Sequence, residues 1–394
     1  MRNVVIVSGK RTPIGRFNGV FKDKTAVELG TIALKGALEA INLDPQHIEE
    51  VIGGHVYQAG CKGNTARQVA IHAGCPVETV AVTINQQCPS SLRATDMLAG
   101  EIMLGKIDAG AVVGMESMTN VPYLLPKARQ GYRMGDAKVV DGLLHDALLD
   151  AFHGYHMGVT AENLVEKYEI SREAQDELAL SSQKRAVAAM EKGIFKEEIV
   201  PVEVKQRRET VVIEEDEGPN PNTTADSLKG LRPVFKEGGT VTAGNASTLN
   251  DGAAALILMA EEKAEALGLE PLARIVGSSS AAVDPKVMGI GVVPAVKKAL
   301  AASNLTKEEI DYWEINEAFA AQFLAVNQEL NIDLDKVNRY GSGISLGHPV
   351  GATGARILVT LIHELQKSKE KYGCASLCAG GGPGAALVVE NVNI

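Results

Sequence analysis

The sequence lacks the features that mark several classes of protein. Its 394 residues carry a net charge of −10, and no basic run interrupts the acidic balance. Nucleic acid and an anionic membrane surface are therefore not expected as partners, because both attract clustered Lys and Arg. No apolar stretch approaches the roughly 18 residues that a membrane span needs. The short apolar run near the N-terminus is expected to be a buried strand and not a secretory signal.

Cysteine is scarce and irregularly spaced. The five cysteines, at 61, 75, 88, 374 and 378, are an odd number in a long chain, and they form no CxxC pair. A disulfide framework, a zinc site and any other metal site are therefore not expected. Free thiols fit a reducing compartment, so the expected location is the cytoplasm. The phosphate-binding patterns GxGxxG and Gly-Lys-Ser/Thr are also absent.

The pattern along the chain predicts a layered α/β fold. Short apolar runs alternate with helical repeats up to residue 117 and again after residue 251. The stretch 120–250 between them is more irregular and is predicted to be an insertion. A weak internal echo links the two regular parts, because "IEEVIGGHV" begins at Ile48 and "IDYWEINEA" at Ile310, an offset of 262 residues. The echo predicts two similar halves whose strand-to-helix turns face each other.

Two of these turns carry side chains suited to nucleophilic chemistry. Cys88, in "NQQCPSS", precedes a helix expected near Ser90. A helix N-terminus stabilises a thiolate, so we expect a lowered thiol pKa and a candidate nucleophile; a buried structural cysteine is the alternative. His348, in "GHPVGATG", precedes a helix expected from about Thr353. A neutral imidazole there can accept a proton from a thiol, and a turn-capping histidine is the alternative.

Two further stretches hold candidate polar groups. Cys378 ends an apolar run and enters "AGGGPG", whose glycines leave backbone N–H groups free to face a ligand, as in an oxyanion hole. Asn316 and Glu317 lie in "WEINEAFAAQ", between an apolar strand and a helical pattern. They are candidates for the site, and the alternative is that they only cap the helix.

In their order and spacing, "NQQCPSS", "NEAFA", "GHPVGATGAR" and "CAGGGPG" resemble the thiolase family, and the resemblance covers the whole chain. It implies a five-layered α/β/α/β/α core of two similar halves with an inserted loop domain. The N-terminal half is expected to comprise 1–119 and 251–268, the loop domain 120–250, and the C-terminal half 269–394. The loop domain is expected to bind coenzyme A and, through "LLPKARQGYRMGD", to join two dimers into a homotetramer.

The resemblance also implies a reaction and a role for each catalytic residue. The reaction is the reversible ping-pong condensation of two acetyl-CoA to acetoacetyl-CoA and CoA, or the reverse thiolysis, within fatty acid metabolism. Cys88 is expected to be acylated, His348 to be its base, and Cys378 to move a proton on the substrate α-carbon. Asn316 is expected to hold a water that forms one oxyanion hole with His348, and the N–H groups of Cys88 and Gly380 the other. No cofactor is implied, because the CoA thioesters are substrates.

The residues that the resemblance places along pantetheine, adenine or the acyl group are His156, Met157, Ser227, Ser247, Met288, Ala318 and Phe319. The sequence departs from the usual family wording at three places. Pro89-Ser90-Ser91 follows Cys88, where the family usually has Gly-Ser-Gly. Asn220 stands where an arginine is usual. The stretch "NRYGSGISLGHP" has Tyr340 and Ser342, which add bulk and polarity close to the expected site. These departures predict retained catalysis with altered chain-length preference or CoA affinity.

Three alternatives stay open at this point. One is a 3-ketoacyl-CoA thiolase of longer or broader chain specificity. Another is a ketoacyl synthase, which uses two histidines, or a histidine and an asparagine, beside its cysteine; Cys378 in the third position favours a thiolase. The last is a thiolase-fold partner subunit with weak catalysis of its own.

Overall fold

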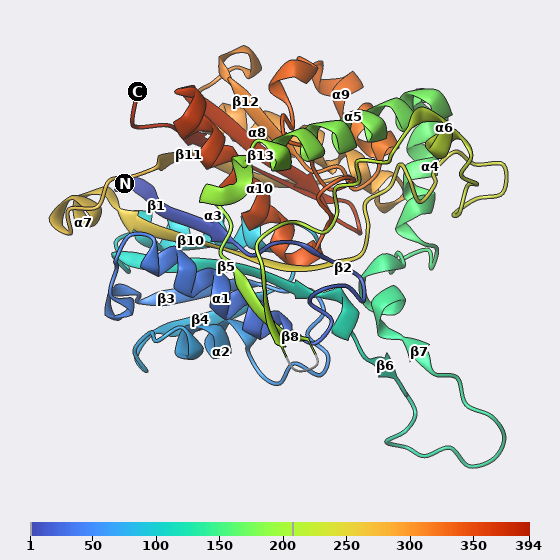
Figure 1. Ribbon diagram of the computed structural model, residues 1–394, viewed down its shortest axis with the longest axis horizontal. Helices are drawn as coiled ribbons and strands as arrows, with labels where there is room; N and C mark the ends of the chain where they lie inside the picture. The colour runs from blue at the N-terminus through green and yellow to red at the C-terminus, as the bar shows by residue number, and fades with distance from the viewer. Residues whose placement is uncertain (1, 207–208) are drawn as a thin grey trace.

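The computed structural model describes residues 2–206 and 209–394, and a long mixed sheet runs through its core (Figure 1). The strand order is β12-β13-β14-β11-β1-β10-β5-β3-β4, with β2 beside β10. A short pairing of β1 with β11 joins the two halves of this sheet. Two small hairpins, β6-β7 and β8-β9, lie outside it. The strands are β1 (Val4–Arg11), β2 (Gly15–Arg16), β3 (Glu50–Gly54), β4 (Val80–Ile84), β5 (Ala109–Ser117), β6 (Tyr123–Leu124), β7 (Val140–Asp141), β8 (Val202–Gln206), β9 (Glu209–Ile213), β10 (Asn250–Ala260), β11 (Ala273–Ala282), β12 (Tyr312–Ile315), β13 (Tyr372–Cys378) and β14 (Pro383–Glu390).

The helices form three layers around the two halves of the sheet. α1 and α2 cover the outer face of one half, α8 and α9 cover the outer face of the other, and α3 and α10 pack between the halves. This arrangement confirms the predicted α/β/α/β/α layering. The helices are α1 (Ala26–Glu39), α2 (Thr65–His72), α3 (Ser90–Met103), α4 (Met157–Tyr168), α5 (Arg172–Glu191), α6 (Ala225–Lys229), α7 (Glu261–Ala266), α8 (Val292–Ser303), α9 (Ala320–Leu330) and α10 (Val350–Ser368).

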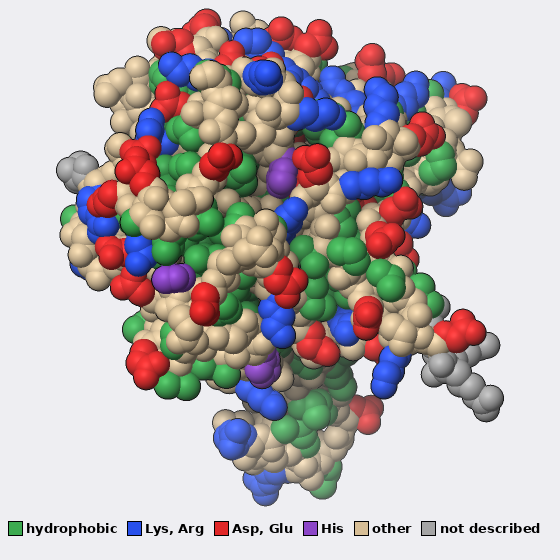
Figure 2. Space-filling view, turned by 60° about the vertical axis from the view of Figure 1, so that its left-hand side comes forward, with side chains coloured by type: hydrophobic (Ala, Val, Ile, Leu, Met, Phe, Trp, Pro, Cys, Tyr) green, Lys and Arg blue, Asp and Glu red, His purple; other side chains and the backbone are tan. Residues whose placement is uncertain are grey.

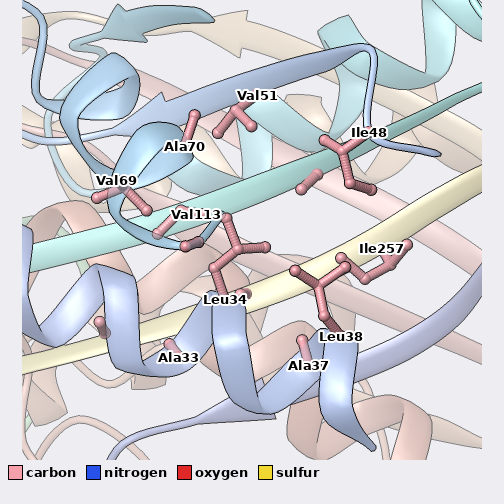
Figure 3. Packing of buried hydrophobic residues seen from close by; sticks show 14 of the residues in the cluster. Ala33, Leu34, Ala37, Leu38, Ile48, Val51, Val69, Ala70, Val113 and Ile257 are labelled. Carbon is pink, nitrogen blue, oxygen red and sulfur yellow. The ribbon is translucent and has the colours of Figure 1, made fainter. Parts of the chain in front are cut away.

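Strand β10 lies at the centre of the molecule and is buried along its whole length. Successive side chains of a strand point to opposite faces. Ala255 and Ile257 therefore pack in the outer core, where Figure 3 shows Leu34 and Leu38 of α1 close to Ile257. Leu256 and its alternate neighbours pack against α3 and α10 in the middle layer. One strand thus contributes to two hydrophobic cores.

The middle layer depends on close contact between backbones. A Cβ on Gly54, at the end of β3, would lie 2.4 Å from the backbone nitrogen of Ser91 on α3. A Cβ on Gly354 of α10 would lie 2.4 Å from the backbone nitrogen of Leu92. Only glycine permits such approaches. The first turns of α3 and α10 therefore lie side by side, at the ends of the strands.

The internal echo corresponds to matching elements. β3 begins at Glu50 and β12 at Tyr312, which is the predicted offset. The helix expected from about Thr353 begins earlier, at Val350. Pro349 is its N-cap, and a proline is compatible with a helix start because it lacks the N–H that would have no partner there.

Much of the segment 120–250 lies outside the layered core. It contributes α4 and α5, and a long loop between β6 and β7 projects from the body (Figure 1). The domain boundaries at residues 119, 250 and 268 stay a prediction. Within the described residues, no helix is long and apolar enough to cross a membrane.

Replacing Gly54 by alanine tests the backbone contact. The added Cβ would meet the α3 backbone at 2.4 Å, so G54A should lower the free energy of unfolding by about 1–3 kcal/mol. Gly100, which lies on α3, is the control, because a Cβ there meets nothing within 4 Å. G100A should be neutral or should stabilise by up to about 1 kcal/mol. Urea unfolding at fixed protein concentration measures both, and equal midpoints for the two variants would contradict the close contact.

Candidate active site

Cys88 lies on a tight elbow between β4 and α3. Gln87, the residue before it, has a left-handed φ of 57°, which is uncommon for a residue with a side chain. The Ser90 hydroxyl fixes the elbow by donating to the Gln87 carbonyl at 2.6 Å and accepting from the Gln86 N–H at 2.9 Å. The serine after Pro89 therefore has a structural role, and the elbow presents the Cys88 thiol to a pocket.

The expectation of a lowered Cys88 pKa is wrong. Burial raises the pKa of the thiol to about 11, and the hydrogen bonds from the backbone N–H groups of Gly380 and Cys88 offset this only in part. Desolvation disfavours the charged form more strongly than the helix N-terminus favours it. At neutral pH Cys88 is therefore a thiol that needs a base.

His348 is held from both its backbone and its ring. Its backbone N–H donates to Asn250 Oδ1 at 2.8 Å, and its Nδ1 lies 2.7 Å from the Thr353 hydroxyl oxygen. The Thr353 hydroxyl also donates to the Pro349 carbonyl at 3.1 Å. Because a hydroxyl has one proton, Thr353 accepts from Nδ1–H, and Nε2 carries the free lone pair. The ring therefore presents a basic nitrogen.

The His348 imidazole is neutral at physiological pH. Burial, helped by the positive charge of Arg356, lowers its pKa from 6.5 to about 3. In this state Nε2 can accept a proton, while Nδ1–H keeps its hydrogen bond to Thr353. This protonation state complements that of Cys88, because one group holds a proton and the other can accept it.

Cys378 lies at the end of β13 and is fully buried. Burial raises the pKa of its thiol well above the ordinary range, and the proximity of Cys88 raises it further. The next turn passes through Gly381 and Gly382, whose φ values of 87° and 105° favour glycine. This turn directs the Gly380 N–H at the Cys88 sulfur. The glycine-rich stretch therefore supplies a backbone donor beside the thiol.

Asn316 lies beside His348, with its Nδ2 3.4 Å from the His348 Nε2. Its Oδ1 is buried and has no hydrogen-bond partner among the described residues. The alternative that Asn316 and Glu317 only cap a helix is wrong. The N-cap of α9 is Phe319, and no side chain caps that helix.

The pocket in front of these groups has apolar walls and an empty volume of about 680 Å³, its open mouth included. His156 stacks on Phe235 with ring centroids 4.5 Å apart, and Phe235 meets Phe319 edge to face. The predicted site residues that line the pocket are Cys88, His156, Met157, Ser247, Met288, Ala318, Phe319, His348, Cys378 and Gly380. The structure thus gathers residues from both halves and from the insertion.

Two predicted residues do not line the pocket. Asn316 is fully buried beside His348, and Ser227 is exposed on α6. The Ser227 hydroxyl donates to the Thr224 carbonyl at 2.8 Å in a capping box, so it has a local structural role. His156, which looks like a helix-surface histidine in the sequence, is the N-cap of α4 and accepts from the Gly158 N–H.

Several residues of the site were not predicted. Thr353 lies within the quoted "GHPVGATG", but nothing in the sequence shows that it contacts the imidazole. Met118 and Leu148 line the pocket and resemble ordinary core residues in the sequence. Phe235 also lines the pocket, and its stretch "LRPVF" carries no pattern that predicts this.

Glu116, near the end of β5, connects the segment after β3 with the first turn of α10. Its carboxylate accepts from the N–H groups of Val56 at 3.1 Å, Tyr57 at 3.2 Å and Gly351 at 2.9 Å. It also lies 3.2 Å from His55 Nε2. The carboxylate therefore fastens the first turn of α10 to the strands beside Cys88. Among the described residues, no group of His, Cys, Asp and Glu side chains is arranged to hold a metal ion.

Comparison with known proteins agrees with this geometry. Residues 4–262 match the family described as "Thiolase, N-terminal domain", and residues 269–391 match "Thiolase, C-terminal domain". The chain is 51% identical to the acetyl-CoA acetyltransferase of Escherichia coli (strain K12) over 394 residues, which is the full length of both chains. The protein is an enzyme of the acyltransferase class. More narrowly, it belongs to the thiolase family.

Solved structures agree in fold over the same length. The crystal structure of the Bacillus anthracis acetyl-CoA acetyltransferase matches with a TM-score of 0.97 at 49% identity, and the match covers 100% of this chain and 99% of that one. The human mitochondrial 3-ketoacyl-CoA thiolase matches with a TM-score of 0.97 at 41% identity and covers 99% of both chains. The thiolase fold predicted from the sequence is confirmed.

The neutral state of His348 predicts a pH dependence of stability. As the pH falls below about 6.5 the unfolded chain binds a proton on this ring, whereas the folded protein binds it only near pH 3. Stability is therefore lost as the pH falls, and His348 contributes a loss of about 2 kcal/mol at pH 5. In H348N, the free energy of unfolding should fall by about 2 kcal/mol less between pH 7.5 and pH 5 than it does in the wild type. Urea unfolding measures it, with the exposed His72 (H72N) as control; the same pH dependence in H348N and wild type would contradict the assignment.

Proposed function

We propose that the protein is an acetyl-CoA C-acetyltransferase, which interconverts two acetyl-CoA with acetoacetyl-CoA and CoA through an acyl-Cys88 intermediate. The observation that carries the proposal is the pocket itself. It brings one thiol, one neutral imidazole, a second thiol and a backbone N–H to the end of an apolar channel. Relatives that match over the whole chain length are named acetyl-CoA acetyltransferase.

The resting protonation states suit the first step of thiolysis. His348 takes the proton of Cys88, and the sulfur attacks the keto carbon of acetoacetyl-CoA. The carbon–carbon bond breaks, and the electron pair leaves as the enolate of acetyl-CoA. Cys378, which is a thiol at rest, gives its proton to the α-carbon of that enolate. Acetyl-Cys88 and free acetyl-CoA result.

The second step returns the enzyme to its starting state. CoA attacks acetyl-Cys88, its thiol proton passes to the Cys378 thiolate, and the Cys88 sulfur regains its proton from His348. Condensation is the same sequence in reverse, in which the Cys378 thiolate removes the α-proton. The oxyanion of the acyl group on Cys88 is bound by the N–H groups of Cys88 and Gly380, and the enolate oxygen lies on the side of His348 and an Asn316-bound water.

Coenzyme A is proposed to enter along the inserted segment. His156, Met157 and Ser247 border the channel to the thiols and would contact pantetheine. Asn220, on an exposed loop, and Ser227, exposed on α6, would then lie near the adenine end. The Asn220 backbone N–H donates to Gln183 Oε1 at 2.9 Å, which keeps this loop on α5. The chemistry needs no cofactor, because the thioesters are themselves the substrates.

A homotetramer built as a dimer of dimers is part of the proposal. The projecting loop 125–139 is exposed throughout, and Met134 is 98% exposed. Basic and apolar side chains gather on this projection, which lies at the bottom of Figure 2. Such a loop suits a contact between subunits. The cytoplasm is the proposed location, because the reaction requires Cys88 and Cys378 as free thiols.

Acylation of Cys88 tests the core of the proposal. Incubation with acetyl-CoA should add one acetyl group to the wild-type protein and none to C88A, as measured by intact mass. C378A keeps the nucleophile and should still be acylated, but its condensation should fall by at least about a hundredfold, because the proton on the α-carbon has no acceptor. A wild-type protein that takes up no acetyl group would contradict the enzyme and would favour a partner subunit with weak catalysis.

A 3-ketoacyl-CoA thiolase of broader chain specificity is the second candidate. It is favoured by the equally close fold of the human mitochondrial 3-ketoacyl-CoA thiolase. The apolar lining from Met118 and Leu148 also offers surface to a longer acyl chain. We expect kcat/KM to fall by at least about tenfold from acetoacetyl-CoA to 3-ketohexanoyl-CoA and again to 3-ketooctanoyl-CoA. A flat or rising series would favour the broader enzyme.

A further inference from the structure

Glu317 is a buried carboxyl group that the mechanism does not use. It follows Asn316 in the chain, is 2% exposed, and does not line the pocket. Within the described part of the chain, no basic side chain lies within ion-pair distance of it. Its oxygens instead accept from two neutral donors, the Ser182 hydroxyl at 2.6 Å and the Asn338 side-chain amide at 3.0 Å. A buried carboxyl group satisfied in this way joins the elements that supply its donors.

Asn338 connects this carboxyl group to the strand that carries Asn316. Its Oδ1 accepts from the Ile315 N–H at 2.9 Å, and its Nδ2 donates to the Ile315 carbonyl at 2.8 Å. The same Nδ2 reaches Glu317. The amide therefore extends the end of β12 in the manner of a neighbouring strand and fixes the residue before Asn316.

Ser182 connects the same carboxyl group to the turn that leads to His348. The Ser182 and Ser345 hydroxyl oxygens lie 2.8 Å apart. Because Ser182 gives its one proton to Glu317, Ser345 donates to Ser182. Ser345 in turn accepts from the Ser342 N–H at 3.2 Å. A directed chain of hydrogen bonds therefore runs from the turn, through helix α5, to Glu317.

The turn lies directly on Asn316. A Cβ on Gly343, between the two serines of the turn, would lie 2.7 Å from Asn316 Oδ1 and 2.7 Å from the Glu317 carbonyl oxygen. The direct contacts between Asn316 and His348 are long, at 3.4 and 3.5 Å. His348 has its own supports in Asn250 and Thr353. The short hydrogen bonds of Glu317 therefore lie next to Asn316, whose backbone N–H donates to the Ser376 carbonyl at 3.0 Å, and none of them reaches the imidazole.

We propose that Glu317, through Ser182 and Ser345, is a positioning residue that holds Asn316 against the His348 turn for the enolate half of the reaction. The inference rests on the proposed function. A loss of this support should slow enolate formation and leave the acylation of Cys88 unchanged, because acylation uses the N–H groups of Cys88 and Gly380.

The test separates the two halves of the reaction in E317Q and S345A. E317Q retains the size of the side chain but places an amide N–H₂ against one of the two donors. S345A removes the bridging hydroxyl. Exchange of the methyl protons of acetyl-CoA with D₂O, followed by NMR, should slow by about tenfold in both variants. The rate of Cys88 acylation by acetyl-CoA and the KM should stay within about twofold.

A double-mutant cycle shows whether Glu317 acts through Asn316. In an N316A background, E317Q should cause no further slowing of the exchange. S8A is the matched control, because Ser8 is a buried serine whose hydroxyl donates to a carbonyl far from the site, and it should leave exchange unchanged. If E317Q does not fold, S345A carries the same test.

Three results would overturn the inference. The first is an unchanged exchange rate in both variants, and the second is an equal slowing of Cys88 acylation. The third is that E317Q slows exchange as much in the N316A background as in the wild type. These results differ from a failure of the proposed function. A wild-type protein that is not acylated would overturn the function. If the wild type is active and the E317Q and S345A variants exchange protons at the wild-type rate, only the role of Glu317 is overturned.

Discussion

The site depends on the backbone contact between the first turns of α3 and α10. Both helices lie between the two halves of the sheet, and glycines at the crossing allow one backbone to touch the other. Cys88 and His348 stand just before these helices, so the contact that packs the middle layer also sets the distance between thiol and imidazole. Glu116 ties the first turn of α10 to the segment after β3 by accepting hydrogen bonds from the N–H groups of Gly351 and Val56. The geometry of the chemistry thus follows from the packing of the core.

The same burial sets the protonation states. Removing these groups from water favours the neutral form of each, so the thiols keep their protons and the imidazole stays uncharged. Cys88, Cys378 and His348 are therefore all uncharged at rest. In the proposed reaction, charges develop only after the substrate binds, where the backbone N–H groups and the imidazole would face them.

The layering and the strand-to-helix turns of the candidate site could be predicted from the sequence, because both leave local patterns. Strands such as β10 appear as continuous apolar runs, and Cys88 and His348 stand at strand-to-helix transitions with small residues around them. The rest depends on tertiary contacts. The direction of the Cys88 pKa shift follows from burial between distant segments, and the role of Thr353 follows from one ring orientation. The start of α10 at Val350 and the local hydrogen bonds of Ser227 likewise have no signal that distinguishes them from alternatives.

The position of β10 has a consequence for synthesis of the chain. This strand, Asn250–Ala260, lies between β1 and β5, which leave the ribosome long before it. Until β10 emerges, no strand lies between β1 and β5, and each of these two strands has an unpaired apolar edge. Pairings over such sequence distances form slowly, and open edges recruit other chains. The nascent chain that ends within 120–249 is therefore the form most exposed to aggregation, and closure of the sheet must wait for the whole insertion to be made.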